Sequence, residues 1–338
     1  MVNKMVGTAS AEISNVCIAS SASVVGKKEG DGALSGWFDI VMPDDEWGEK
    51  SWEKTESKMQ KEAVKLAISK ADLTPSDIDK IFSGDLLNQC IGAGFGLREL
   101  KIPFYGIYGA CSTMIEGVSL ASMLIDGGFA KTAVAVTSSH YCTAERQYRN
   151  PLEYGGQRTP SAQWTVTGSG AVTLKAGNDG ICVNKITTGK IIDMGVTDAN
   201  NMGGAMAPAA YETIKTHFSD FGVSPDDYDC IVTGDLGQVG SDILKDLLLK
   251  DGIDITKKHR DCGLLIYDRK RQDVHAGGSG CGCIASVLCG YFTKEMLSGR
   301  MSKILAVGTG ALLSTTSSLQ GESVPGIAHA ISLGIGGK

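Results

Sequence analysis

Residues 73–89 read LTPSDIDKIFSGDLLNQ, and residues 223–239 read VSPDDYDCIVTGDLGQV. The two stretches align without a gap, and identical residues occupy equivalent positions in both copies: Pro75/Pro225, Asp77/Asp227, Asp79/Asp229, Ile81/Ile231, Gly84/Gly234, Asp85/Asp235 and Leu86/Leu236. Self-similarity of this kind indicates that one structural unit has been duplicated. The repeat therefore predicts two copies of the same fold within one chain.

Each copy of the repeat predicts a helix, a turn and a strand. The segments 62–70 and 211–221 precede the two copies and carry apolar residues at helical spacing. A Pro-Asp turn follows, and the β-prone pairs at 81–82 and 231–232 then lead to a Gly-Asp dipeptide. We expect the two aspartates to lie at equivalent strand ends.

A second, weaker correspondence supports the duplication. Residues 127–139 and 298–311 each place a glycine turn before a continuous apolar run. Runs without alternation are typical of central strands that helices cover on both faces. We therefore predict an α/β protein with an N-terminal half at 1–175 and a C-terminal half at 176–338. Ligand sites in such folds collect at the C-terminal ends of the strands.

Composition and charge exclude several classes of protein. The 338 residues include 44 glycines without a three-residue period, and 32 basic against 38 acidic residues give a net charge of −6. These values argue against a collagen-like chain and a nucleic-acid-binding protein. The longest apolar stretch, 118–136, contains Asp126 and Lys131, so it is too short to span a membrane. We expect no signal peptide and a chain that is soluble or peripheral to a membrane.

The ten cysteines are spread over the whole sequence, and most lie in apolar segments. This distribution favours reduced thiols in an intracellular protein over a disulfide scaffold. The pair Cys281 and Cys283 has no second pair to complete a zinc site. The sequence therefore predicts no metal site and no cofactor.

One cysteine lies at a predicted strand-to-helix elbow. Residues 104–114 read FYGIYGACSTM, in which an apolar strand leads through a glycine into a helix that begins near Cys111. The positive end of a helix dipole favours a thiolate, so we expect the pKa of Cys111 to be lowered. Such a thiol could take an acyl group from a thioester. Alternatively, Cys111 only packs in a tight turn.

These features resemble a known superfamily. The duplicated halves, the GACS elbow and the glycine-rich strand end at 306–311 resemble the thiolase fold of thiolases and ketoacyl synthases, which implies a five-layered αβαβα architecture. More specifically, several segments resemble the stage V sporulation protein AD family: GDLLNQ at 84–89, YGACSTM at 108–114, the segment 138–160, TGSGA at 167–171, AMAPAA at 205–210 and VHAGGSGCGC at 274–283.

The resemblance to condensing enzymes implies partners for the cysteine that this sequence lacks. Such an enzyme uses a histidine with an asparagine or a second histidine. The first position falls at 233–238, which reads TGDLGQ, and the second falls at Gly277. Each missing donor costs about 10²- to 10³-fold in rate. We therefore expect a non-catalytic protein. His275, two residues upstream, is either a displaced catalytic group or a structural histidine.

The resemblance to the sporulation family implies a binding function. It predicts a protein that binds dipicolinic acid, free or as its calcium complex, and supports uptake of this compound into the forespore and its release in germination. The implied partners are membrane-embedded proteins of the stage V sporulation A operon, met at the inner spore membrane of the sporulating cell, and a second copy of the chain in a homodimer. Two alternatives stay open: an active acyltransferase that uses Cys111 with His140 or His275 as base, and a scaffold that only docks membrane partners.

A site for a flat dianion needs anion donors and a slot for its ring. The elbow at Cys111 offers helix-terminal N–H groups, the segment 140–158 is rich in cations, and the repeated aspartates could hydrogen-bond loops or orient a cation, calcium included. The predicted ligand-binding residues are Asp85, Cys111, Ser112, His140, Arg146, Arg149, Asp235, Gly277 and Gly278.

Simpler roles are open for most of these residues. The arginines could make surface ion pairs, because Glu145 is nearby. The aspartates could cap neighbouring turns, since a role in the fold duplicates more easily than a ligand contact. The glycines could allow close approach of the backbone near the pseudo-twofold axis.

Overall fold

The computed structural model describes residues 4–148 and 158–336. The strands are β1 Met5–Val6, β2 Ser10–Glu12, β3 Val16–Val25, β4 Ile40–Val41, β5 Lys80–Gly84, β6 Phe104–Gly106, β7 Thr132–Ser139, β8 Trp164–Thr165, β9 Gly168–Ala176, β10 Gly180–Thr187, β11 Cys230–Thr233, β12 His259–Asp261, β13 Gly278–Ser279, β14 Lys303–Ala311 and β15 Gly326–Gly336. The α-helices are α1 Lys27–Gly30, α2 Trp52–Lys70, α3 Ile91–Leu97, α4 Thr113–Asp126, α5 Tyr141–Tyr148, α6 Met202–Phe221, α7 Gly237–Lys250, α8 Cys262–Leu265, α9 Cys281–Val287, α10 Thr293–Leu297 and α11 Thr315–Leu319.

The main sheet is symmetric about its centre. Its strand order is β12-β11-β14-β15-β10-β3-β9-β7-β5-β6. In one half, β5 is parallel to β6 and β7, and β9 is antiparallel to β7 and β3. In the other half, β11 is parallel to β12 and β14, and β15 is antiparallel to β14 and β10. The antiparallel pair β3·β10 joins the two halves.

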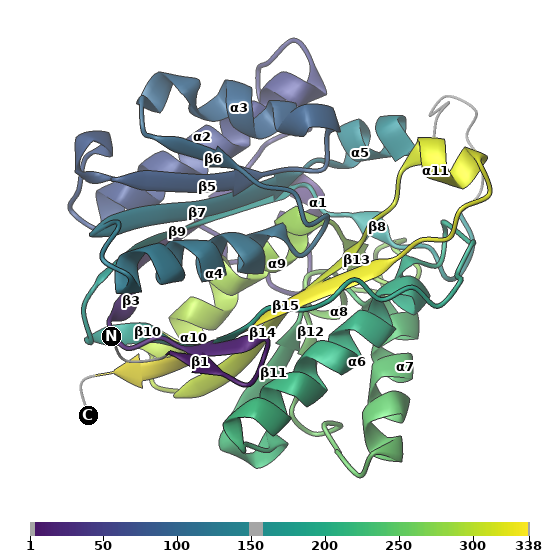
Figure 1. Ribbon diagram of the computed structural model, residues 1–338. Helices are drawn as coiled ribbons and strands as arrows, with labels where there is room; N and C mark the ends of the chain where they lie inside the picture. Colours follow the sequence, from purple (N-terminus) through teal and green to yellow (C-terminus); the bar gives the residue numbers. More distant parts are fainter. Residues whose placement is uncertain (1–3, 149–157, 337–338) are drawn as a thin grey trace.

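The molecule has five layers (Figure 1). Helices α2 and α3 cover the outer face of the β6-β5-β7-β9-β3 half, and α6 and α7 cover the outer face of the other half. Helices α4 and α9 lie between the two halves of the sheet, where α4 contacts both β7 and β14. Because helices cover both faces, β7 and β14 are buried at every position except the first. The predicted αβαβα architecture is confirmed.

The repeat forms the same local structure twice. Helix α2, the 3₁₀ turn Pro75–Asp77 and β5 correspond to α6, the 3₁₀ turn Pro225–Asp227 and β11. Both turns begin with a capping box, in which Asp77 pairs with Thr74 and Asp227 pairs with Ser224. The predicted helix, turn and strand are therefore confirmed in both copies.

The start of each long helix is fixed by a polar side chain. Ser51 accepts a hydrogen bond from the N–H of Lys54 at the start of α2, and Asn201 accepts one from Gly204 at the start of α6.

Strand β9 ends at Ala176 and β10 begins at Gly180. The division of the chain at residue 175 stays a prediction.

One cysteine pair differs from the sequence prediction. Cys17 of β3 and Cys182 of β10 are directly opposite in the ladder and form a disulfide. The expectation that these two thiols are reduced is therefore wrong, because strand register brings together residues that are 165 positions apart. The other cysteines are free.

Among the described residues, no helix combines the length and apolar character needed to cross a membrane.

Candidate functional site

A tightly held turn carries Cys111 between β6 and α4. The Ser112 hydroxyl donates to the carbonyl of Gly109 over 2.7 Å, and the Thr113 hydroxyl donates to the carbonyl of Ala110 over 2.6 Å. Gly310 of β14 packs against this turn so closely that a Cβ there would lie 2.5 Å from the Gly109 oxygen. The elbow is thus held by its own side chains and by a strand of the other half.

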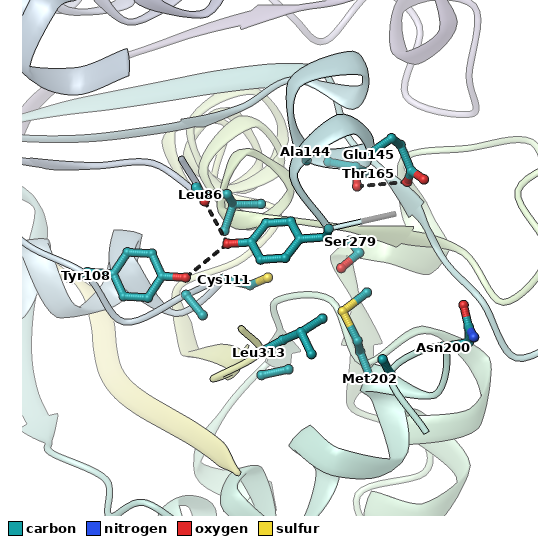
Figure 2. Close-up of a pocket in the computed structure, with 14 residues that line it drawn as sticks. Leu86, Tyr108, Cys111, Ala144, Glu145, Thr165, Asn200, Met202, Ser279 and Leu313 are labelled. Atoms are coloured by element: carbon teal, nitrogen blue, oxygen red, sulfur yellow. Dashed lines mark hydrogen bonds between the residues drawn. The ribbon is translucent and has the colours of Figure 1, made fainter. Parts of the chain in front are cut away.

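A cavity of about 230 Å³ opens beside Cys111 (Figure 2). Its wall comes from several elements: the residues after β5, the end of β14 and the loop after it, the Cys111 elbow, helix α5, strands β8 and β13, and the start of α6 with the segment before it. Its lining is Leu86, Tyr108, Ala110, Cys111, Ala144, Glu145, Tyr148, Thr165, Ala199, Asn200, Met202, Ser279, Ala311 and Leu313. The cavity is smaller than the roughly 300–1,000 Å³ typical of sites for drug-sized ligands, so it suits a small molecule.

The wall combines apolar surface with a few hydroxyl groups. The hydroxyls of Tyr108 and Tyr148 are 3.2 Å apart, and the Tyr148 hydroxyl also donates to the carbonyl of Leu86 over 2.7 Å (Figure 2). The hydroxyl of Thr165 lies 3.5 Å from a carboxylate oxygen of Glu145. Among the described lining residues, Glu145 is the one with a formally charged side chain.

A second cavity of about 410 Å³ adjoins the first. Leu86, Tyr108, Tyr148 and Leu313 line both, so the two tyrosines stand between them. Its other described lining residues include amide and hydroxyl side chains from the 3₁₀ turn Asn88–Cys90, α5 and the start of α11. The two cavities therefore share one wall, and we call the cavity beside Cys111 the inner cavity and the second one the outer cavity.

A buried carboxylate lies behind the floor of the inner cavity. Asp235 accepts hydrogen bonds from the Ser279 hydroxyl at 3.0 Å, from the Gly280 N–H at 2.8 Å and from the Thr309 hydroxyl at 2.8 Å. It also forms a hydrogen bond with the Cys111 thiol. Burial raises the pKa of Asp235. Two residues of the cavity wall, Cys111 and Ser279, thus contact this carboxylate directly.

The predicted lowering of the pKa of Cys111 is wrong. Burial raises this pKa well above its usual value, and the charge of Asp235 together with its hydrogen bond raises it further. Cys111 is 5% exposed, so it has lost the water that would stabilise a thiolate. The thiol is therefore held in its protonated form, in which it donates to Asp235.

Neither candidate histidine lies in the inner cavity. The Nε2 atom of His140 is 2.9 Å from the carbonyl oxygen of Asp45, and burial lowers the pKa of this ring. His275 contacts the carbonyl of Thr159 through Nδ1 at 2.7 Å and the carboxylate of Asp273 through Nε2 at 3.0 Å. All five histidines of the chain lie in the described ranges, and none lines this cavity. Both rings hold neighbouring loops.

Four other predicted residues have structural contacts outside the inner cavity. Asp85 accepts the N–H groups of Leu87 and Ala93 at 2.8 Å and 2.7 Å, as expected of a turn cap. Ser112 holds the elbow. Gly277 and Gly278 accept hydrogen bonds through their carbonyls from the backbone of Trp164 and the side chain of Gln163. Their roles in ligand binding stay predictions.

Arg146 does not bring a cation into the described wall of the cavity. Arg146 forms an ion pair with Glu53 and lies over the Trp52 ring at 5.3 Å, with 47% of its side chain exposed. Its partner is thus Glu53 of α2 instead of the neighbouring Glu145. Arg149 lies outside the described residues.

Sequence reasoning missed most of the wall. Tyr108 and Ser279 belong to the same motifs as Cys111 and Gly278, so their motif positions could have identified them. Asn200 and Met202, by contrast, lie in a segment without a motif and reach the cavity only through the tertiary fold. Within the two described ranges, no group of three or more His, Cys, Asp or Glu side chains could hold a metal ion.

Solved structures of known enzymes have the same fold. The structure of 3-oxoacyl-[acyl-carrier-protein] synthase III from Aquifex aeolicus aligns with a TM-score of 0.60 at 17% identity, over 94% of this chain and 99% of that one. OleA of Xanthomonas campestris, solved with bound lauric acid and lauroyl-CoA, aligns with a TM-score of 0.61 at 14% identity, over 95% and 99% of the two chains. At these identities the likeness shows the thiolase-like fold alone.

A family model and a curated relative give a closer match. The model for stage V sporulation protein AD matches residues 7–334. Stage V sporulation protein AD of Bacillus subtilis (strain 168) is 49% identical over 316 residues, which cover 94% of this chain and 93% of the relative. With its thiolase-like fold and its match over almost the whole sequence, this chain belongs to the stage V sporulation protein AD family.

Proposed function

We propose that this sporulation protein binds dipicolinic acid, free or as its calcium complex, in the cavity beside Cys111, without catalysing a condensation. The observation that carries the proposal is the environment of the thiol. Cys111 donates to a buried carboxylate, and no imidazole lies among the described residues of the cavity wall. A condensing enzyme needs a thiolate and donors that stabilise developing negative charge. Such a cavity can still bind a small molecule.

The shape and chemistry of the wall support a small aromatic acid as ligand. Tyr108, Tyr148, Leu86, Leu313 and Met202 supply apolar and aromatic surface for a planar ring. The side-chain amide of Asn200 can donate hydrogen bonds to a carboxylate, and the hydroxyl of Ser279 can do so when it turns away from Asp235. A mainly apolar pocket with a few convergent polar groups is typical of small-molecule sites.

In the spore, the bound ligand would be exchanged with membrane-embedded partners of the stage V sporulation A operon. The protein would then act at the inner spore membrane, in uptake of dipicolinate into the forespore and in its release during germination. The family assignment supports this role, since the related protein is a stage V sporulation protein.

A homodimer is part of the proposal. Strand β6 is at the edge of the main sheet, and all three of its residues are exposed. Phe104 and Tyr105 are 42% and 49% exposed, so this edge presents two large aromatic side chains to solvent. Pairing of β6 with the β6 of a second copy would cover this edge in a twofold arrangement.

Calorimetry with the purified protein tests the binding function. We expect saturable binding of dipicolinate that exceeds the binding of phthalate and benzoate, which lack the pyridine nitrogen. Ala144→Phe, which fills the cavity from α5, should remove the binding and leave the circular dichroism spectrum unchanged. The exposed substitution Leu297→Phe serves as a matched control. Binding of dipicolinate no stronger than that of the two analogues would refute the proposal.

An active acyltransferase is the second candidate. It is favoured by the thiol at the cavity wall and by OleA, a structure of the same fold that is described with bound lauric acid and lauroyl-CoA. Mass spectrometry after incubation with acyl-CoA separates the two functions. An acyl adduct on Cys111 that forms and turns over supports the transferase, whereas an unmodified thiol supports binding alone. A protein that shows neither binding nor acylation would act only as a scaffold.

A further inference from the structure

The described wall of the inner cavity offers no cationic side chain to an anionic ligand. Among the described residues of its wall there is no lysine, arginine or histidine, and Glu145 contributes a carboxylate. A second carboxylate, Asp235, lies one side chain behind the floor, in contact with Ser279 and Cys111. An anion in this cavity would therefore lie close to the buried carboxylate of Asp235.

Electrostatic repulsion makes the binding of an anion unfavourable unless a nearby acidic group is neutralised at the same time. Like charges in a desolvated site repel strongly, because few water molecules screen them. The usual outcome is that one acidic group takes up a proton, as in pairs of carboxylates that share one site. A ligand that brings its own cation would avoid this requirement.

We propose that an anionic ligand enters the Cys111 cavity together with one proton, which comes from the solvent and is held on the carboxyl group of Asp235. In solution, a buffer acid loses the proton that Asp235 gains. This inference depends on the proposed binding function and adds its pH regulation.

The contacts of Asp235 suit both of its protonation states. The hydroxyls of Ser279 and Thr309 donate to it, and a hydroxyl can rotate to accept instead. A proton on Oδ1 of Asp235 can thus be donated to the Thr309 oxygen, while Oδ2 keeps the Gly280 N–H and the Ser279 hydroxyl as donors. No backbone movement is needed for the change.

The groups around Asp235 favour proton uptake. Cys111 faces it from the elbow, Asp261 from β12, Cys262 from α8 and Cys283 from α9. His259 is linked to Asp261 through the Thr233 hydroxyl, and burial lowers the pKa of this imidazole to about 4, so it is neutral. None of these described neighbours carries a positive charge at neutral pH, and burial already raises the pKa of Asp235.

The linkage predicts the direction of the pH dependence. A bound anion raises the pKa of Asp235. At pH values between the pKa of Asp235 in the free protein and its pKa in the complex, binding is therefore accompanied by uptake of one proton. The affinity for the anion then falls as pH rises through this interval, by up to about tenfold per pH unit. Below the free pKa, Asp235 is protonated before binding, and the affinity becomes independent of pH.

Calorimetry with dipicolinate in buffers of different ionisation enthalpy measures the proton directly. Titrations with a calcium chelator present, between about pH 6 and 9, cover the range in which buried carboxyls with raised pKa values titrate and in which the ligand is already ionised. We expect uptake approaching one proton at the maximum. Asp235→Asn should reduce the uptake to near zero and flatten the pH dependence of the affinity.

Two variants serve as controls. Glu56→Gln removes another fully buried carboxyl, which accepts from Ser138 and Thr143 outside the cavity wall, and should leave the proton uptake unchanged. Glu145→Gln removes the carboxylate of the wall itself and should leave the proton uptake unchanged as well. Loss of the uptake in Glu145→Gln, with retention in Asp235→Asn, would overturn the assignment to Asp235.

Further outcomes separate this inference from the proposed function. Saturable binding without proton uptake at any pH refutes the inference and leaves the binding function intact, whereas absence of binding refutes both. If Asp235→Asn does not fold, infrared difference spectroscopy of the unmodified protein replaces it. Binding should then produce the C=O stretch of a protonated carboxyl group, and a spectrum without this band overturns the inference.

Discussion

The Cys111 thiol experiences two opposing electrostatic effects. The start of α4 favours a thiolate through the helix dipole, whereas burial and the carboxylate of Asp235 favour the protonated thiol. A helix end contributes roughly 0.3–1 kcal/mol, less than the penalty for a buried charge next to another charge of the same sign. The raised pKa of Cys111 follows from this balance.

The reactivity of Cys111 tests this balance. We expect iodoacetamide to alkylate Cys111 much more slowly than it alkylates free cysteine at pH 8, because the thiolate fraction is small. Asp235→Asn removes the neighbouring charge, so it should raise the rate by about tenfold, equivalent to one pKa unit. Mass spectrometry of the modified peptide gives both rates. Alkylation of the unchanged protein at the rate of free cysteine would contradict the assigned environment.

Glu29 provides a pH-dependent prediction for stability. This residue accepts hydrogen bonds from Tyr267 and from the N–H of Thr167, and burial raises its pKa from 4.5 to about 7. Since the folded pKa is the higher one, the stabilisation is complete below pH 4.5 and is lost as pH rises through 7. Replacing Glu29 by glutamine removes this titration. The effect of Glu29→Gln on the free energy of unfolding should therefore be more stabilising at pH 8 than at pH 5, by about 2–3 kcal/mol.

Thermal unfolding of Glu29→Gln and of the unchanged protein at both pH values measures this effect. The exposed substitution Glu12→Gln is the control and should show no such difference. An equal effect of Glu29→Gln at pH 5 and pH 8 would show that the carboxyl does not titrate in this interval.

At the scale of elements, the repeat explains what could be predicted from sequence. Pro75 and Asp77 act within a few residues of each other, so the capping turn is visible in the sequence, as it is at Pro225 and Asp227. The wall of the cavity is different. Asn200 and Leu313 reach it from loops whose positions depend on the packing of the two halves, and no local pattern encodes this.

The two capping boxes give a paired prediction. Thr74→Ala and Ser224→Ala each remove one side-chain cap from equivalent turns, so each should lower the free energy of unfolding by about 1 kcal/mol. Ser219→Ala, on the exposed face of α6, should not destabilise the protein. Urea unfolding measures all three variants. A loss confined to one of the two turns would contradict their structural equivalence.

At the scale of the whole molecule, the duplication brings two helix starts and two sets of strand ends to one centre. The elbow before α4 comes from the first half, whereas Asp235 and Ser279 come from the second. The burial of Cys111 and its contact with Asp235 therefore exist only in the assembled five-layered fold. The predicted lowering of the pKa of Cys111, which rested on one helix end alone, had the wrong sign for this reason.

The open edge of the sheet leads to a prediction for the assembly. Tyr105→Lys places a charge on β6 and should shift the proposed homodimer to monomer in sedimentation equilibrium. Phe129→Lys is a matched control, because Phe129 is 78% exposed and lies in the turn between α4 and β7. A dimer that persists in Tyr105→Lys, or dissociates equally in both variants, would exclude pairing through β6.

A crystal structure of the protein soaked with dipicolinate tests the central claim most directly, because it locates the ligand and shows the state of the thiol together. We expect density for a planar ligand between the tyrosines and Ser279, beside an unmodified Cys111. Density for the ligand at another place with this cavity empty, or an acyl group on the Cys111 sulfur, would contradict the account.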